Sequence, residues 1–114
     1  MAVINYEAIR LAEVEMNGAK NVTKAIVIGA DEGWRDHVMR VFRLDPGGFT
    51  PRHRHDWEHV NHVIRGRGRL RLGGAVHELK EKDFAFVPSN TEHQFENPYE
   101  EPFEFICIVP NRGA

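Results

Sequence analysis

The sequence is poor in cysteine and has no long apolar run. Its only cysteine, Cys107, cannot form an internal disulfide and cannot by itself build a thiolate metal cage. No stretch approaches the roughly 20 apolar residues of a transmembrane helix. Asn5, Glu7 and Arg10 interrupt the first ten residues, which therefore do not resemble a secretory signal. We expect a protein of the reducing cytoplasm that does not enter a membrane.

An excess of positive charge is also absent. Fifteen lysines and arginines face 17 aspartates and glutamates, which gives a net charge of −2. Such a chain has no broad field for holding a nucleic-acid backbone. The arginine- and glycine-rich run 65–71 resembles an RNA-binding segment, but it falls between two β-rich runs and is better explained as a solvated turn. We expect no nucleic-acid partner.

Short β-rich runs separated by glycine, proline and acidic turns fill most of the chain. About eight such runs follow one another at intervals typical of an all-β barrel or sandwich. They cover 25–28, 38–44, 59–65, 69–72, 75–79, 84–87, 94–95 and 103–109. The sequence Asp45-Pro46-Gly47-Gly48 predicts a turn that ends the second run. We expect one domain over residues 1–114, with segment 1–29 adding to the sheet of a partner in a homodimer.

Histidine is the residue that stands out, with seven copies in 114 residues. His53 and His55 lie two apart, so a strand would present both imidazoles on one face. His59 keeps the same parity if the chain stays extended, or returns to that face after a short bend at Asp56-Trp57, and His93 follows a different strand. Imidazole is the commonest metal ligand, although strand surfaces also carry histidines that bind nothing. The other three, His37, His62 and His77, are expected to lie on the outer surface.

Two spaced motifs carry a family resemblance. Residues 47–66, with Gly47-x5-His53-x-His55-x3-His59-x6-Gly66, resemble the first cupin motif, and residues 82–97, with Lys82-x5-Pro88-x-Asn90-x2-His93-x3-Asn97, resemble the second. The resemblance implies a double-stranded β-helix, or jelly-roll, barrel with a metal site in its mouth. It also implies His53, His55, His59 and His93 as the ligand set.

The motifs depart from the family pattern at three positions. His59 stands where the first motif has glutamate, and the adjacent Glu58 is an alternative carboxylate ligand. The spacing to Gly66 and the strand parity favour His59. Lys82 and Asn90 replace two glycines; Asn90 should keep its turn, because asparagine tolerates a left-handed backbone better than most residues.

The resemblance implies one divalent transition metal ion. Manganese and iron are favoured by it, and copper, nickel and zinc remain compatible with imidazole ligands. Four neutral imidazoles leave the charge of the ion uncompensated, which favours an anionic ligand.

Strand alternation predicts which residues face the pocket. They are Arg40, Phe42, Asn61, Phe105 and Cys107. Three of them have alternatives: Arg40 as a solvated or interface residue, Asn61 as a core amide bonded to backbone, and Cys107 as a small buried apolar group.

A metal-dependent oxidoreductase of the dioxygenase type, acting on a small organic substrate, is the leading functional hypothesis. The alternatives are a metal-dependent isomerase, lyase or hydrolase, and a non-catalytic module that binds a small ligand or a metal. The fold class alone does not separate them.

Overall fold

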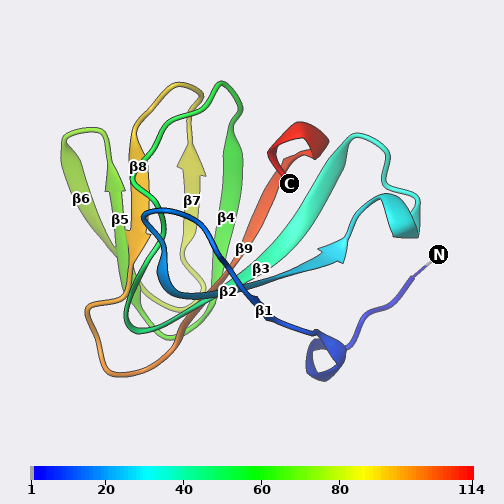
Figure 1. Cartoon of the computed structure of the whole chain (residues 1–114), viewed down its shortest axis with the longest axis horizontal. Helices are drawn as coiled ribbons and strands as arrows, with labels where there is room; N and C mark the ends of the chain where they lie inside the picture. The colour runs from blue at the N-terminus through cyan, green and yellow to red at the C-terminus, as the bar shows by residue number, and fades with distance from the viewer. Residues whose placement is uncertain (1) are drawn as a thin grey trace.

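Short antiparallel strands make up most of the protein, as the alternating runs predict. The computed structural model describes residues 2–114 (Figure 1). Its strands are β1 (Ala12–Glu13), β2 (Lys20–Ile28), β3 (His37–Phe49), β4 (His59–Arg65), β5 (Gly68–Leu72), β6 (Ala75–Leu79), β7 (Phe84–Val87), β8 (His93–Glu96) and β9 (Phe103–Pro110). The 3₁₀ turns are η1 (Tyr6–Ala8), η2 (Ala30–Glu32) and η3 (Asn111–Gly113).

The strands form one antiparallel sheet that curls on itself into a half-barrel (Figure 1). Its order is β6-β5-β8-β3-β9-β4-β7, with β2 also paired to β3 and β1 paired to β2. Strands from distant parts of the sequence therefore lie side by side, and β3 pairs with β9 over residues 37–44. The all-β jelly-roll fold expected from the two motifs is confirmed. No helix among residues 2–114 is both long and apolar enough to cross a membrane.

Alternation along the strands separates an inner face from an outer face. On β4, His59, Asn61 and Val63 are buried, whereas the residues between them are more exposed, as the parity predicts. On β9 the alternate residues that face inward form much of the core: Phe103, Phe105, Cys107 and Val109. Glu104 alternates with these residues and points to the opposite face of β9. Glu104 is nevertheless not exposed to solvent on that face: it is wholly buried and accepts a hydrogen bond from Arg65 at 3.1 Å.

The prediction that Asp45-Pro46-Gly47-Gly48 ends a strand is wrong. β3 runs through this sequence to Phe49, and a register shift between Lys20 and Val22 of β2 marks the irregularity. Before the bend β3 pairs with β9, and after it Phe49 pairs with β8, so the strand turns a corner between two parts of the sheet. Gly48 lies so close to the backbone oxygens of Asn21 and Asp45 that a Cβ would be 2.8 Å from each. The glycines thus allow a bend without ending the pairing.

Four motif positions adopt a left-handed backbone. Gly47 and Gly66 have φ values of 80° and 71°, and the two departures from glycine, Lys82 and Asn90, have 76° and 61°. The turn geometry is therefore kept at Asn90 as expected, and also at Lys82, where a lysine adopts a conformation that glycine accommodates more easily.

The N-terminal segment joins the sheet of its own chain. β2 pairs with β3 over most of its length, and β1 adds to β2. The addition of segment 1–29 to a partner's sheet stays a prediction; position 1 lies outside the described residues.

Candidate metal centre

Backbone pairing brings the two histidine motifs together at one end of the sheet. His53 and His93 form an isolated antiparallel bridge, in which each backbone N–H donates to the other's carbonyl at 3.2 and 2.9 Å. The N–H of Asn90 donates to the carbonyl of His55 at 2.7 Å. The left-handed turn at Asn90 thus ties the loop of the first motif to the strand of the second.

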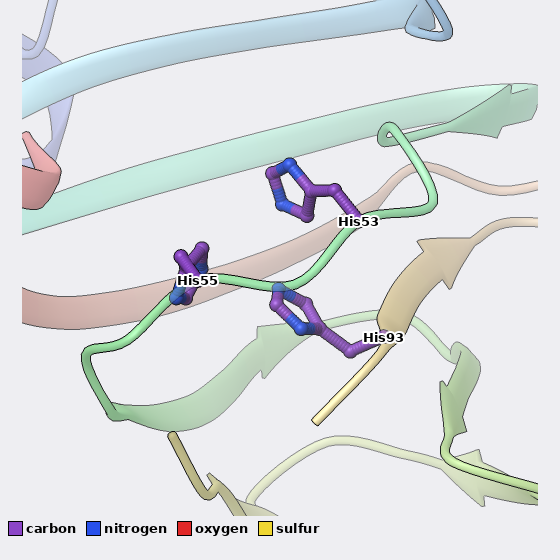
Figure 2. Close-up of side chains that lie close together, drawn as sticks. All are labelled: His53, His55 and His93. Carbon is purple, nitrogen blue, oxygen red and sulfur yellow. The ribbon is translucent and has the colours of Figure 1, made fainter. Parts of the chain in front are cut away.

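The four predicted histidines converge. The candidate ligand nitrogens of His53, His55 and His93 lie within 4.8 Å of one another, and Figure 2 shows His53 and His55 on one loop and His93 on the neighbouring strand. His59 completes the group from β4, with its Nε2 3.0 Å from Nε2 of His55 and its ring centroid 4.7 Å from that of His93.

Hydrogen bonds to backbone carbonyls fix the protonation of two rings. Nδ1–H of His55 donates to the carbonyl of Trp57, and Nδ1–H of His93 donates to the carbonyl of Thr91, both at 2.9 Å. A carbonyl only accepts, so the proton sits on Nδ1 and Nε2 keeps its lone pair. Nε2 of His93 is buried and has no hydrogen-bond partner. This is the arrangement of metal-binding histidines, whose second nitrogen is usually held by an acceptor.

Burial keeps the cluster neutral. Desolvation, together with the neighbouring His93, lowers the pKa of His59 to about 3. Desolvation also lowers the pKa of His93 to about 4, against the opposing effect of the Thr91 hydrogen bond. The pKa values of His53 and His55 are lowered, again mainly by burial. Neutral imidazoles offer the lone pairs that a cation needs.

These residues fit a divalent transition metal ion. Two nitrogens about 2.1 Å from one ion, and at right angles to each other, lie about 3.0 Å apart, which matches the separation of His55 and His59. The unpartnered Nε2 of His93 gives a second reason, because a buried acceptor without a partner is costly. The alternative ligand Glu58 is exposed, whereas His59 is buried beside the other rings.

A cavity of about 330 Å³ opens beside the four histidines. Most of its wall is apolar or aromatic, and no aspartate or glutamate of residues 2–114 lines it. Lys24, Arg40 and Arg112 supply positive charge. A cavity of this kind suits a small molecule with an apolar body and an electron-rich head.

Strand register places the predicted pocket residues. Across β4, β9 and β3, Asn61 pairs with Cys107 and Cys107 pairs with Arg40, while Phe105 pairs with Phe42 in the next row. Arg40, Phe42, Phe105 and Cys107 line the cavity. Asn61 lies outside the lining: it is buried, and its amide donates to the carbonyl of Ile106 at 3.3 Å.

Cys107 connects the cavity wall to the histidines. Its sulfur lies 3.5 Å from Nδ1 of His59 and accepts a hydrogen bond from Nη2 of Arg40 at 3.0 Å. Burial raises the pKa of the Cys107 thiol, although Arg40 opposes the shift. The thiol is therefore protonated at neutral pH and orients the ring of His59.

Several parts of the wall were not among the predicted pocket residues. Lys24 lies opposite Phe42 on β2, and the C-terminal turn contributes Gly113 to the lining. Trp57 lines the cavity and stacks on His55, with centroids 4.2 Å apart. Alternation in β2, where Val22 and Lys24 share a face, could have indicated Lys24. Nothing local signals that the residues after β9 fold back over the cavity.

The family assignment rests on a match as well as on geometry. The cupin domain family matches residues 40–109, and this chain belongs to that family. The match spans all four histidines and the cavity residues Arg40, Phe42, Phe105 and Cys107, whereas Lys24 and Gly113 lie outside it. The metal-binding character of the site therefore agrees with the family to which the chain belongs.

Individual relatives have several activities. The chain is 34% identical over 71 residues to 1-methylthio-D-xylulose 5-phosphate methylsulfurylase of Rhodospirillum rubrum, covering 62% of this chain and 46% of that enzyme. The chain thus spans about half the length of this relative. The structure is similar to the polyketide cyclase RemF of Streptomyces resistomycificus, with a TM-score of 0.90, 28% identity, and coverage of 96% and 79% of the two chains. A predicted oxalate decarboxylase of Thermotoga maritima shares the fold, with a TM-score of 0.85, 21% identity, and coverage of 96% and 98%.

Proposed function

We propose that this protein is a metal-dependent enzyme that binds a small organic substrate in the cavity beside His53, His55, His59 and His93. The observation that carries the proposal is the convergence of four neutral imidazoles, two with Nε2 lone pairs fixed by backbone acceptors, on a largely apolar cavity. A bound divalent ion would supply a Lewis acid, and as manganese, iron or copper also a redox centre.

The remaining residues bind and orient the substrate. Phe42 and Phe105, whose rings stack with centroids 5.4 Å apart, offer a flat apolar wall. Trp57 closes the side next to His55 and shields that ring from water. Cys107 holds His59 from behind. The wall therefore selects a substrate by shape, while the histidines set where its reacting end lies.

The dioxygenase reaction is the finer form of this proposal. It is favoured because the cavity lining contains no aspartate or glutamate within residues 2–114. A reaction that depends on a protein carboxylate as general base has none at hand. Glu58 is exposed, and neither it nor Glu92 or His62 is part of the lining.

A non-oxidative lyase, isomerase or cyclase reaction is the second candidate. Lys24 and Arg40 favour it, because positive side chains stabilise negative charge that develops on a carbonyl oxygen. The similarity to a protein described as a polyketide cyclase supports this class as well. The proton acceptor would then be an imidazole, Lys24 or solvent.

One experiment tests the proposal and separates the candidates. The protein loaded with manganese, iron or copper is incubated with a panel of 2-oxo acids, hydroxy acids and β-diketones, in air and under argon, and products are followed by NMR with oxygen uptake in parallel. Conversion only in air, with matching oxygen uptake, identifies the dioxygenase. Equal conversion in both identifies the non-oxidative class. Conversion that survives both chelation and His59→Ala contradicts metal-dependent catalysis.

The proposal includes the setting expected for the protein. A homodimer in the reducing cytoplasm, without membrane or nucleic-acid partners, agrees with the single free thiol of Cys107 and the net charge of −2. Light scattering at micromolar concentration checks the dimer, and a monomer there contradicts it.

A further inference from the structure

Arg40 is a buried cation in the cavity wall. Only 8% of the residue is exposed, and it lies on β3 among residues that line the cavity. Its Nη1 donates to the carbonyl of Gly113 at 3.2 Å and its Nη2 to the sulfur of Cys107 at 3.0 Å. Its guanidinium also lies 4.9 Å from the ring centroid of Phe42. These contacts hold the guanidinium in place, but none of them carries a negative charge.

No anion of the described chain neutralises this charge. Seven other arginines among residues 2–114 form ion pairs with carboxylates, and Arg40 does not. Its Nε is buried without a hydrogen-bond partner. A buried charge without a counter-charge is costly, and proteins rarely keep one without a use for it.

A second cation stands beside it. Lys24 lines the same cavity from β2, and the register places it opposite Phe42, one row along the sheet from Arg40. Lys24 also forms no ion pair within residues 2–114. Burial and the charge of Arg40 both lower the pKa of Lys24, which means that the two cations are close enough to repel each other. The β2–β3 wall thus concentrates positive charge where no acidic side chain faces it.

We propose that Arg40 and Lys24 form an oxyanion subsite, and that the substrate of this cavity carries a carboxylate or phosphate group in addition to the end that meets the histidines. This inference rests on the proposed function and adds a substrate class to it: small, bifunctional organic acids with an apolar middle section. The anion supplies the counter-charge that the chain lacks, and the aromatic wall of Phe42 and Phe105 lies alongside that middle section.

A pair of probes isolates the second acidic group. 2-Oxoglutarate and 2-oxovalerate have the same 2-oxo acid head and five carbons, and only the former has a distal carboxylate. Calorimetry with manganese-loaded protein is expected to show 2-oxoglutarate binding about ten-fold or more tightly, as charge-assisted contacts allow. Competition by inorganic phosphate then identifies the source: displacement of 2-oxoglutarate indicates a phosphate subsite, and no displacement indicates a carboxylate subsite.

Matched variants assign the preference to the two cations. Lys24→Gln is expected to remove most of this preference, and Arg40→Gln to abolish it. Lys20→Gln is the control, because Lys20 is exposed on the same strand and lies outside the lining. Arg40→Lys keeps the charge if Arg40→Gln fails to fold. Equal binding of both probes to the unaltered protein, or equal losses in Lys20→Gln and Lys24→Gln, overturns the subsite.

The same titrations on metal-free protein separate this inference from the proposed function. If the protein does not retain added metal but still prefers 2-oxoglutarate to 2-oxovalerate, the result supports the subsite and contradicts the proposed function. Retained metal with no such preference supports the metal centre and contradicts the subsite.

Discussion

The seven histidines divide into two groups that share a side chain and differ in almost everything around it. His53, His55, His59 and His93 gather at one point, and two of them donate Nδ1–H to backbone carbonyls. His37 and His77 are exposed, and His37 stacks on Trp34 with centroids 5.7 Å apart. His62 stacks on Phe84 at 4.3 Å on the outer side of β4. An imidazole becomes a candidate ligand here through its place where the two motifs meet, and at His55 and His93 also through a fixed tautomer.

Removing a ligand breaks the first group and should have the largest effect. His59→Ala is expected to reduce bound metal from about one equivalent to nearly none, because the remaining imidazoles no longer close the coordination shell. Elemental analysis of tag-free protein measures it. His77→Ala is the control, and equal metal loss in both variants contradicts the division into two groups.

Acid should destabilise the metal-free protein through the same group. His59 and His93 have pKa values of about 3 and about 4 in the folded chain, below the ordinary 6.5. The unfolded chain therefore binds more protons between these values and pH 6.5, and the free energy of unfolding falls as pH is lowered through that window. Urea titrations are expected to show a loss of roughly 4–6 kcal/mol between pH 7 and pH 4, since each of the two shifted groups contributes about 3 kcal/mol over this range.

The acid effect has its own control. His59→Gln should flatten the pH dependence, since one of the two strongly shifted groups is gone, whereas His37→Gln should leave its slope unchanged. A slope that is identical in all three proteins would assign the acid sensitivity to other residues.

The contact between Cys107 and His59 should have a smaller effect on metal binding than the loss of a ligand. Cys107→Ala removes the sulfur 3.5 Å from Nδ1 of His59, and metal affinity is expected to fall about 10–100-fold, the range for groups that orient a ligand. Cys107→Ser should restore part of it, because a hydroxyl can also accept from Nδ1–H. Competition with a chromogenic chelator measures the affinity; equal losses in both variants would indicate a packing defect instead.

Changing a histidine of the second group should have the smallest effect. His62→Leu keeps an apolar contact with Phe84 and removes a buried Nδ1 that has no partner. The free energy of unfolding is expected to change by less than about 1 kcal/mol, with metal content unaltered. Thermal unfolding and elemental analysis check both points, and a loss of metal would place His62 in the first group.

Much of the fold and the four candidate ligands could be predicted because their signals are local. Parity places His53 and His55 together, and motif spacing adds His59 and His93. The sequence Asp45-Pro46-Gly47-Gly48 predicts a turn that ends a strand, whereas β3 continues to Phe49, because pairing beyond the glycines is made with β8, which is distant in sequence. Lys24 and Gly113 were missed for the same reason: the register of β2 on β3 and the return of the C-terminal turn are long-range outcomes.

The pairing of β3 with β9 also sets an order of events during synthesis. Residues 37–44 find their partners only at 103–110, so closing this ladder joins segments about 60 residues apart, a slow step for an antiparallel sheet. The four histidines all precede β9, whereas Phe105 and Cys107 belong to it. When the four histidines have emerged from the ribosome, Phe105 and Cys107 of the cavity wall have not yet been synthesised or released. We expect stable metal capture only after β9 emerges, so the ion would lock a barrel that has already closed.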